Sequence, residues 1–487
     1  MPPDLRIRCR WVWLALLAVF IPSIGRAGAT DAARGLEHVN HILVLMQENH
    51  SFDNYLGTLP YIPGGPYHPP AKPGGACPAN DHQCVDGLTC VRDAHGNLSC
   101  INSNPGANGG KVFVYHESAY CTANPPHEWI DAHREANFEH PNASEILGDG
   151  FARVRPSNTT AMGYYTQDDL PFYYALAETF ALSDAHFSAL IGPTMPNRSY
   201  LMAATSFGHV LTSAIDNTPP VSSGYRPITG TVFDLLDQHR VSWAEYYELP
   251  NDHMTPPRPY GRLFRDPSLP NFKLIENFFA DARAGSLPHV AFISLAQHEH
   301  PPLDIRAGEY AVARIVAALR ASPNWNDSIL FLIYDENGGF YDHARPPAAP
   351  SPDGIPPGQC ADLSHPPVSK TPGQGAHCIL SLMAQRILCP AADGHCADFT
   401  LAGFRDPLIV VSAFARAHYV SHVSNDQTSI LALIEKRFLA NQHLTARDAA
   451  AASLEEMFDF AQAPSREAKV AAMLAPAPKP EDPGCSR

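Results

Sequence analysis

Short apolar runs recur along the chain and alternate with segments of helical periodicity. The candidate strands lie at 41–47, 241–246, 290–294, 329–334 and 408–411, and all but the second are apolar runs. Apolar runs of this length are typical of strands that are buried on both faces of a parallel sheet. Helical patterns lie among them, for example at 310–319 and 428–438. The alternation predicts an α/β fold with a doubly wound, mostly parallel central sheet flanked by helices.

Two of these runs end directly in side chains that carry oxygen ligands. Asp335 and Glu336 follow the run 329–334, and Glu48 and Asn49 follow the run 41–47. Each pair alone could equally be a solvated turn. In open α/β sheets, however, ligands bind outside the carboxyl ends of the strands. Carboxylate and amide oxygens suit hard divalent ions, so the two pairs together predict one divalent metal ion, whose identity the sequence does not give.

A third segment, 192–204, offers a nucleophile. It predicts a turn that leads into a helix, with Pro196 in the first helical turn. We expect Thr194 to lie just before the helix N-terminus, where free N–H groups and the helix dipole favour phosphate. The alternative is that Thr194 only caps the helix.

Taken in order, these segments resemble a bacterial phosphoesterase family that contains phospholipases C and related acid phosphatases, within the alkaline-phosphatase-like superfamily. The matching stretches are 47–53, 192–198, 335–343 and 403–407, followed by 420–422, 426–429 and 433–438. The resemblance spans about residues 38–440. It implies an alkaline-phosphatase-like fold and hydrolysis of a phosphoric ester.

The resemblance also implies roles for individual residues. The implied metal ligands are Glu48, Asn49, Thr194, Asp335 and Glu336, and Thr194 is also the implied nucleophile. The implied active-site histidines are His127 and His300. The residues expected to bind substrate are Asn197, Arg198 and His343.

Three positions depart from the common family pattern. Asn337 and Gln427 stand where histidine is usual, and Asp406 stands where valine is frequent. None of the three is an implied metal ligand or the nucleophile. We therefore expect the departures to affect substrate preference rather than the chemistry.

The function predicted from these residues is metal-dependent hydrolysis through a phosphothreonine intermediate. Thr194 and Asn337 favour a phospholipase C-type phosphodiesterase. The absence of the C-terminal domains found in larger phospholipases favours the alternative, an acid phosphatase. A sulfatase is disfavoured because no formylglycine motif occurs at Thr194. A catalytically inactive secreted binding protein is a further alternative, although all the implied ligands are present.

The N-terminus has the layout of a cleavable secretory signal at 1–29, and a retained anchor is the alternative. Arginines precede an apolar stretch from 11 to about 24, and small residues follow at 27–29. Removing this segment leaves ten of the 11 cysteines. In an exported chain, an even number of cysteines predicts disulfides rather than zinc sites. The first group has an odd member, for which Cys485 is a candidate partner. We expect a secreted or periplasmic protein.

The loop-rich segments and the net charge indicate the domain organisation and the partners that we expect. We expect one catalytic domain at 30–474, with disulfide-rich loop insertions at about 60–121 and 350–400, and an extended tail at 475–487. The formal net charge of −15 and the lack of basic runs disfavour nucleic acid as a partner. The expected partner is a phosphate-ester substrate, and transient contact with a membrane surface is compatible with the sequence. The oligomeric state does not follow from the sequence.

Overall fold

The computed structural model describes residues 35–156, 159–212, 229–248, 268–359, 376–389, 396–461 and 485. The expected signal segment and all of the expected tail except Cys485 lie outside these residues. Among the described residues, no helix is both long enough and apolar enough to span a membrane.

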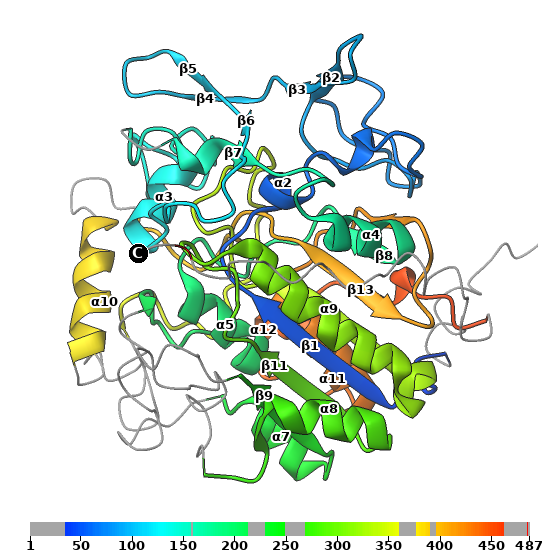
Figure 1. The fold of residues 1–487 in the computed structure, drawn as a ribbon. Helices are drawn as coiled ribbons and strands as arrows, with labels where there is room; N and C mark the ends of the chain where they lie inside the picture. The colour runs from blue at the N-terminus through cyan, green and yellow to red at the C-terminus, as the bar shows by residue number, and fades with distance from the viewer. Residues whose placement is uncertain are drawn as a thin grey trace, which may run out of the picture.

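The core of the fold is an eight-stranded sheet (Figure 1). Its spatial order is β10 (Phe272–Leu274), β9 (Trp243–Tyr247), β11 (Val290–Ser294), β1 (His41–Gln47), β12 (Ser328–Tyr334), β13 (Leu408–Ser412), β8 (Ala181–Ser183) and β14 (Tyr419–Ser421). All neighbouring strands are parallel except at β13, which runs antiparallel to both β12 and β8. The predicted α/β class with a mostly parallel sheet is therefore confirmed.

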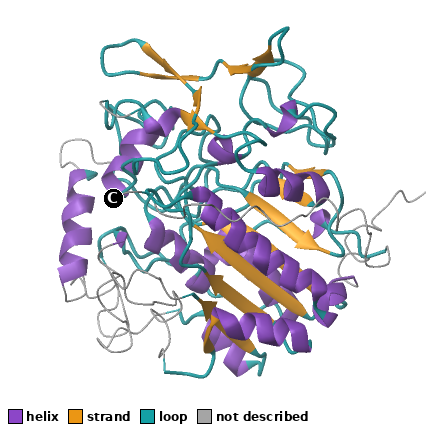
Figure 2. Cartoon of the chain, in the orientation of Figure 1, coloured by secondary structure: helices purple, strands orange, loops and turns teal. Residues whose placement is uncertain are grey.

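Helices cover both faces of this sheet, as Figure 2 shows. Leu43 and Leu45 of β1 face a cluster formed with helices α4 (Pro171–Thr179), α8 (Ile275–Ala284) and α9 (Ile305–Ala321). The alternate residues Ile42, Val44 and Met46 face helices α5 (Thr194–Ala203), α7 (Val232–Gln238) and α11 (Gln427–Phe438). Burial on both faces explains why β1 is apolar throughout rather than alternating.

The expected insertion at about 60–121 consists mostly of loops with short strands, and it lies beyond the end of β1 that leads into α2 (Phe52–Tyr55) (Figure 1). Three small pairs of strands form there. They are β2 (Cys90–Arg92) with β3 (Leu98–Cys100), β4 (Ser103–Pro105) with β5 (Lys111–Phe113), and β6 (Tyr115–His116) with β7 (Gly163–Tyr164). Such short strands cannot bury a core of their own.

Disulfides tie these loops together, as predicted. The bonds are Cys77–Cys84, Cys90–Cys100, Cys121–Cys485 and Cys389–Cys396. The third bond confirms Cys485 as the partner of the odd cysteine in the first group. Cys360 and the side chain of Cys378 lie outside the described parts of the chain.

The second insertion is less irregular than expected, because it contains helix α10 (Ala376–Ile387). This segment has neither glycine nor proline and is rich in alanine, leucine and other strong helix formers. Helix α10 packs against α3 (Trp129–Ala136). A contact across more than 200 residues of sequence stabilises a helix in a way that local patterns cannot predict.

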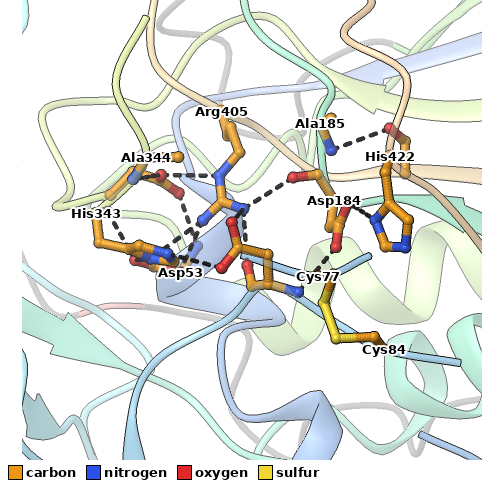
Figure 3. A network of polar contacts seen from close by, with 12 residues as sticks. Asp53, Cys77, Cys84, Asp184, Ala185, His343, Ala344, Arg405 and His422 are labelled. Atoms are coloured by element: carbon orange, nitrogen blue, oxygen red, sulfur yellow. Dashed lines mark hydrogen bonds and ion pairs between the residues drawn. A yellow bond between two sulfur atoms is a disulfide. The ribbon is translucent and has the colours of Figure 1, made fainter. Parts of the chain in front are cut away.

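A buried arginine joins the first insertion to the sheet (Figure 3). The Arg405 guanidinium bonds Asp342 through Nε at 2.9 Å and Asp53 through Nη2 at 3.2 Å. Its Nη1 donates to the backbone oxygens of Asp86, in the insertion, and of Asp184, after β8. Its side chain is only 1% exposed. Replacing one partner of such a buried network leaves uncompensated charge, so it holds these segments in one arrangement.

His343 belongs to the same network. Its Nδ1 lies 2.7 Å from Asp53 Oδ2 and its Nε2 lies 3.1 Å from Asp86 Oδ1. Burial lowers the pKa of His343, but the Asp53 carboxylate and these hydrogen bonds outweigh burial and raise the pKa to about 10. The imidazolium therefore links α2, the insertion and the loop after β12 at neutral pH.

We predict that His343→Gln lowers the free energy of unfolding in a pH-dependent way. Because the folded-state pKa lies above the unfolded value of about 6.5, the stabilisation is complete below about pH 6.5 and is lost as the pH rises towards 10. Urea denaturation should show a difference from the unsubstituted protein of about 2 kcal/mol at pH 6. That difference should shrink steadily up to pH 10. The exposed His68 offers a matched control, since His68→Gln should change little. A difference for His343→Gln that stays constant over this range would contradict the account.

Candidate active site

The two strand ends that carry oxygen ligands lie side by side. Parallel pairing of β1 with β12 places Gln47 opposite Tyr334, so the residues that follow each strand emerge together. The backbone N–H of Asn49 donates to Asp335 Oδ1 at 3.2 Å. A Cβ atom on Gly338 would lie 2.4 Å from the backbone oxygen of Asn49, so this close approach requires glycine after the acidic pair.

Arg198 bridges the acids of the two strands. Its Nη2 lies 3.0 Å from Glu48 Oε1 and its Nε lies 3.0 Å from Asp335 Oδ2. The arginine side chain is 2% exposed and belongs to α5. The sequence predicted a role in substrate binding, which stays a prediction. The observed contacts show Arg198 fixing α5 against both strand ends.

Thr194 is the first residue of α5 rather than the residue just before the helix, and Pro193 is the N-cap. No side chain makes a capping hydrogen bond there, so the contacts do not support capping as the reason for Thr194. Instead, Thr194 Oγ1 lies 3.5 Å from Asn49 Oδ1, at the limit of a hydrogen bond. The structure thus brings the candidate nucleophile to the predicted ligands.

Asn197 holds the turn that presents this threonine. Its Oδ1 accepts from the backbone N–H of Leu190 at 3.0 Å, and its Nδ2 donates to the backbone oxygens of Gly192 and Pro193. These bonds lie within the loop itself. A contact between Asn197 and substrate therefore stays a prediction.

Both predicted histidines lie at the site. His127 Nδ1 donates to the backbone oxygen of Pro125 at 2.8 Å, which leaves Nε2 free to accept from Asn49 Nδ2 at 3.1 Å. Burial, followed by the nearby His300, lowers the pKa of His127 to about 4. The two rings meet edge to face, with their centroids 5.6 Å apart. His127 is therefore a neutral ring whose Nε2 also lies 3.8 Å from Glu336 Oε1.

Sequence reasoning missed a third histidine. His298 Nδ1 lies 3.1 Å from Glu48 Oε2. Burial lowers the pKa of His298, but Glu48 outweighs it and the pKa is raised. His298 lies shortly after the end of β11, a strand whose carboxyl end meets the same edge of the sheet. That position is the sequence signal that would have identified it.

The three residues that depart from the family pattern are all buried. Gln427 Nε2 donates to the backbone oxygen of Asp335 at 3.1 Å and so holds the end of β12. Asp406 is fully buried with its Oδ1 3.3 Å from His186 Nε2. Asn337 Nδ2 donates to the backbone oxygen of Phe340 at 3.0 Å, within its own loop. Gln427 and Asn337 thus hold the segment that carries Asp335 and Glu336, whereas Asp406 contacts the segment after β8.

The charge at the strand ends fits a divalent cation. Burial would raise the pKa of Glu48, but His298 and Arg198 hold it well below its usual range. Burial raises the pKa of Asp335 to about 7, and burial together with Asp335 raises the pKa of Glu336 well above its usual range. Glu336 Oε1 has no hydrogen-bond partner among the described residues. Three ionised carboxylates carry three negative charges against one positive charge on Arg198 and one on protonated His298, so a net negative charge remains for a divalent cation to offset.

Three groups of His, Cys, Asp and Glu in the described chain have ligand atoms within 4.8 Å of one another, and the carboxylates of the candidate site are not among them. One is Asp53, Asp342 and His343, which Arg405 already bridges. A second includes Cys77, whose sulfur is bonded to Cys84. The third is Glu435, His443 and Asp448, where Asp448 completes the capping box of α12 (Ala446–Ala449). None of these groups contains a predicted metal ligand.

A pocket of about 440 Å³ opens onto Thr194. Its lining includes His127, Glu128, Asp131, Arg155, Thr194 and His300. The candidate nucleophile and both predicted histidines therefore share one cavity. Burial raises the pKa of Glu128 and that of Asp131, which also line this pocket.

Comparison with known proteins shows which proteins this chain is similar to. A model of the Phosphoesterase family matches residues 39–440. Phospholipase C A of Mycobacterium tuberculosis is 30% identical over 469 residues, which cover 91% of this chain and 82% of that protein. Non-hemolytic phospholipase C of Pseudomonas aeruginosa is 30% identical over 69% of this chain and 46% of its own length. Non-specific phospholipase C5 of Arabidopsis thaliana is 25% identical over 86% of this chain and 74% of its own length.

The matched range contains every residue of the site described above, and it agrees with the span over which the sequence motifs occur. The resemblance inferred from those motifs is therefore confirmed. The chain belongs to the Phosphoesterase family, and it is a hydrolase that acts on phosphoric esters.

Proposed function

We propose that this chain is a secreted, metal-dependent phospholipase C-type phosphodiesterase that acts through a phosphothreonine intermediate on an alkaline-phosphatase-like scaffold. The observation that carries the proposal is the position of Thr194. Its hydroxyl lies at the N-terminus of α5, 3.5 Å from Asn49 Oδ1, and it lines the same pocket as His127 and His300. The disulfides support secretion, since such bonds form in oxidising compartments.

The residues that would hold the metal ion are Glu48, Asn49, Thr194, Asp335 and Glu336. When bound, a divalent ion would polarise a phosphoryl oxygen and lower the pKa of the threonine hydroxyl. Glu336 Oε1, which has no hydrogen-bond partner among the described residues, is the clearest free ligand atom. The identity of the ion is left open because oxygen-rich sites accept several divalent ions.

The side chains of the site can carry out the two chemical steps. Thr194 Oγ1 attacks phosphorus in line, and the bond from phosphorus to the leaving alcohol breaks. The first turn of α5 places the positive end of its dipole beside the phosphoryl group on Thr194. Water then attacks phosphorus and releases the threonine, which restores the enzyme.

Both histidines of the pocket could take part in proton transfer. His127 is neutral, and its Nδ1 donates to the backbone oxygen of Pro125, so its Nε2 can accept a proton or a hydrogen bond. His300 lines the same pocket, and its Nδ1 likewise faces a backbone oxygen, that of Pro301, at 2.6 Å. The hydrogen bonds therefore do not by themselves assign protonation of the leaving alcohol to one of the two rings.

The size of the pocket and the names of the relatives favour a diester substrate. A cavity of about 440 Å³ extends from Thr194 to Glu128 and Asp131, which leaves room for a second alcohol beside the phosphate. All three relatives described above carry the name phospholipase C. An acid phosphatase is the second candidate. An inactive binding protein is disfavoured because the structure assembles all the predicted catalytic residues.

Thr194→Ala should lower kcat/KM by at least about 1,000-fold, because the nucleophile and a metal ligand are lost together. Circular dichroism should show an intact fold, since Thr194 makes no capping bond. Ser199→Ala is a matched control, because it removes another buried hydroxyl from α5. It should keep most of the activity. Retention of more than a few per cent of activity by purified Thr194→Ala would rule out its assignment as nucleophile.

Chelation should abolish turnover, and one divalent ion should restore it. Metal analysis of the purified protein should find one tightly bound ion per chain, and Glu336→Gln should lower that occupancy, because it removes the free carboxylate oxygen. Glu276→Gln, the same change at an exposed position of α8, should keep the ion. Full activity of the metal-free protein would show that the convergent carboxylates serve another purpose.

The diester assignment is tested with matched substrates. Phosphatidylcholine should yield diacylglycerol, and its kcat/KM should exceed that of p-nitrophenyl phosphate by at least about 10-fold, because the pocket seats a second alcohol. Efficient turnover of the monoester with no release of diacylglycerol would instead support the acid phosphatase.

A further inference from the structure

Helix α10 carries a stripe of exposed apolar side chains beside its buried face. The buried face packs against the body of the protein through Ser381, Ala384 and Gln385, each at most 8% exposed. The stripe consists of Leu380, Met383 and Ile387, which are 45%, 55% and 56% exposed. Single exposed apolar side chains are ordinary. Three at positions i, i+3 and i+7, however, form one continuous stripe along a helix. Such a stripe marks a candidate contact surface.

This stripe lies close to the catalytic pocket. Gln385 Oε1 accepts a hydrogen bond from Trp129 Nε1 at 3.1 Å. Trp129 begins α3 and follows His127, which lines the pocket with Thr194, by two residues. Figure 1 shows α10 at the edge of the molecule, directly beside α3. A group that contacts the exposed face of α10 would thus lie about one helix diameter, roughly 10 Å, from the wall of the pocket.

The charge of α10 differs from that of the rest of the chain. The chain has a formal net charge of −15, yet residues 376–389 contain no carboxylate. Arg386 is exposed next to Ile387. An apolar stripe flanked by a cationic side chain complements a phospholipid surface, where phosphate oxygens lie above acyl chains.

The area of the stripe argues against a protein partner. A stable interface between two proteins buries about 800 Å² on each side. Three aliphatic side chains on one short helix provide far less than this. Insertion of a few aliphatic side chains into a lipid surface has no such requirement, since the lipid adapts to their shape.

We propose that the Leu380–Met383–Ile387 stripe docks the protein on a zwitterionic phospholipid surface and holds the pocket of Thr194 against it. The choice of lipid rests on the proposed phospholipase function. Docking of this kind brings the substrate to the pocket from the side of α3. It also explains why an acidic protein without a basic patch in its sequence can work at a membrane.

The test measures vesicle binding separately from chemistry. In a Thr194→Ala background, which leaves lipid intact, phosphatidylcholine vesicles are sedimented with the protein. The combined substitution Leu380→Ser, Met383→Ser and Ile387→Ser should weaken binding by at least about 10-fold, because three apolar side chains no longer enter the lipid. The matched control changes Val91, Ile101 and Phe113 to serine, three residues that are 62%, 54% and 53% exposed in the first insertion. The control should bind as before.

The same substitutions are then placed in the active enzyme. The ratio of kcat/KM on vesicles to kcat/KM on a monomeric short-chain phosphatidylcholine should fall at least about 10-fold for the stripe variant and stay unchanged for the control. Equal vesicle binding by the stripe variant and its parent would overturn the proposal. So would a larger loss of binding in the control.

Two further outcomes separate this proposal from its alternatives. If light scattering finds an oligomer that the stripe variant dissociates, the stripe covers a second copy of the chain and the lipid proposal is wrong. If the protein binds vesicles through the stripe but hydrolyses no phosphodiester, docking stands and the proposed function fails.

Discussion

The active site depends on how the protein offsets the negative charge of three carboxylates that are buried at the ends of two adjacent strands. Glu48, Asp335 and Glu336 would repel one another strongly in a low-dielectric interior. Arg198 offsets part of this charge by bonding Glu48 and Asp335 at 3.0 Å each. His298 supports Glu48 from the other side. The remaining negative charge is the reason that we propose a divalent cation here.

This compensation also fixes the geometry of the nucleophile. Because Arg198 belongs to α5, its ion pairs hold the first turn of that helix, and with it Thr194, against the strand ends. Asn197 locks the preceding turn through backbone bonds. A second buried arginine, Arg405, joins the overlying insertion to the same sheet. Two arginine-centred networks thus add to the apolar packing of these segments, and breaking either would leave a buried charge unpaired.

Much of this arrangement followed from the sequence. The strands 41–47 and 290–294 were predicted with the bounds that the structure has, because each is a buried apolar run that ends in polar residues. The direction of β13 could not be predicted, since an apolar run carries no information about strand direction. The three-residue strands β8, β10 and β14 are too short to show any periodicity. Helix α10 was missed although its sequence is rich in strong helix formers, because the whole range 350–400 was interpreted as a loop-rich insertion. His298 was missed because only strand pairing brings it to Glu48.

The central claim is that Thr194 becomes covalently modified during turnover. Acid quenching of the enzyme during turnover of a phosphodiester, followed by peptide mass spectrometry, tests it most directly. The account predicts a phosphoryl adduct on the peptide that contains Thr194, which forms with the substrate and disappears when the substrate is exhausted. An adduct on His127 or His300 would contradict it. So would product formation, at a full rate, from an enzyme that never carries a phosphoryl group on Thr194.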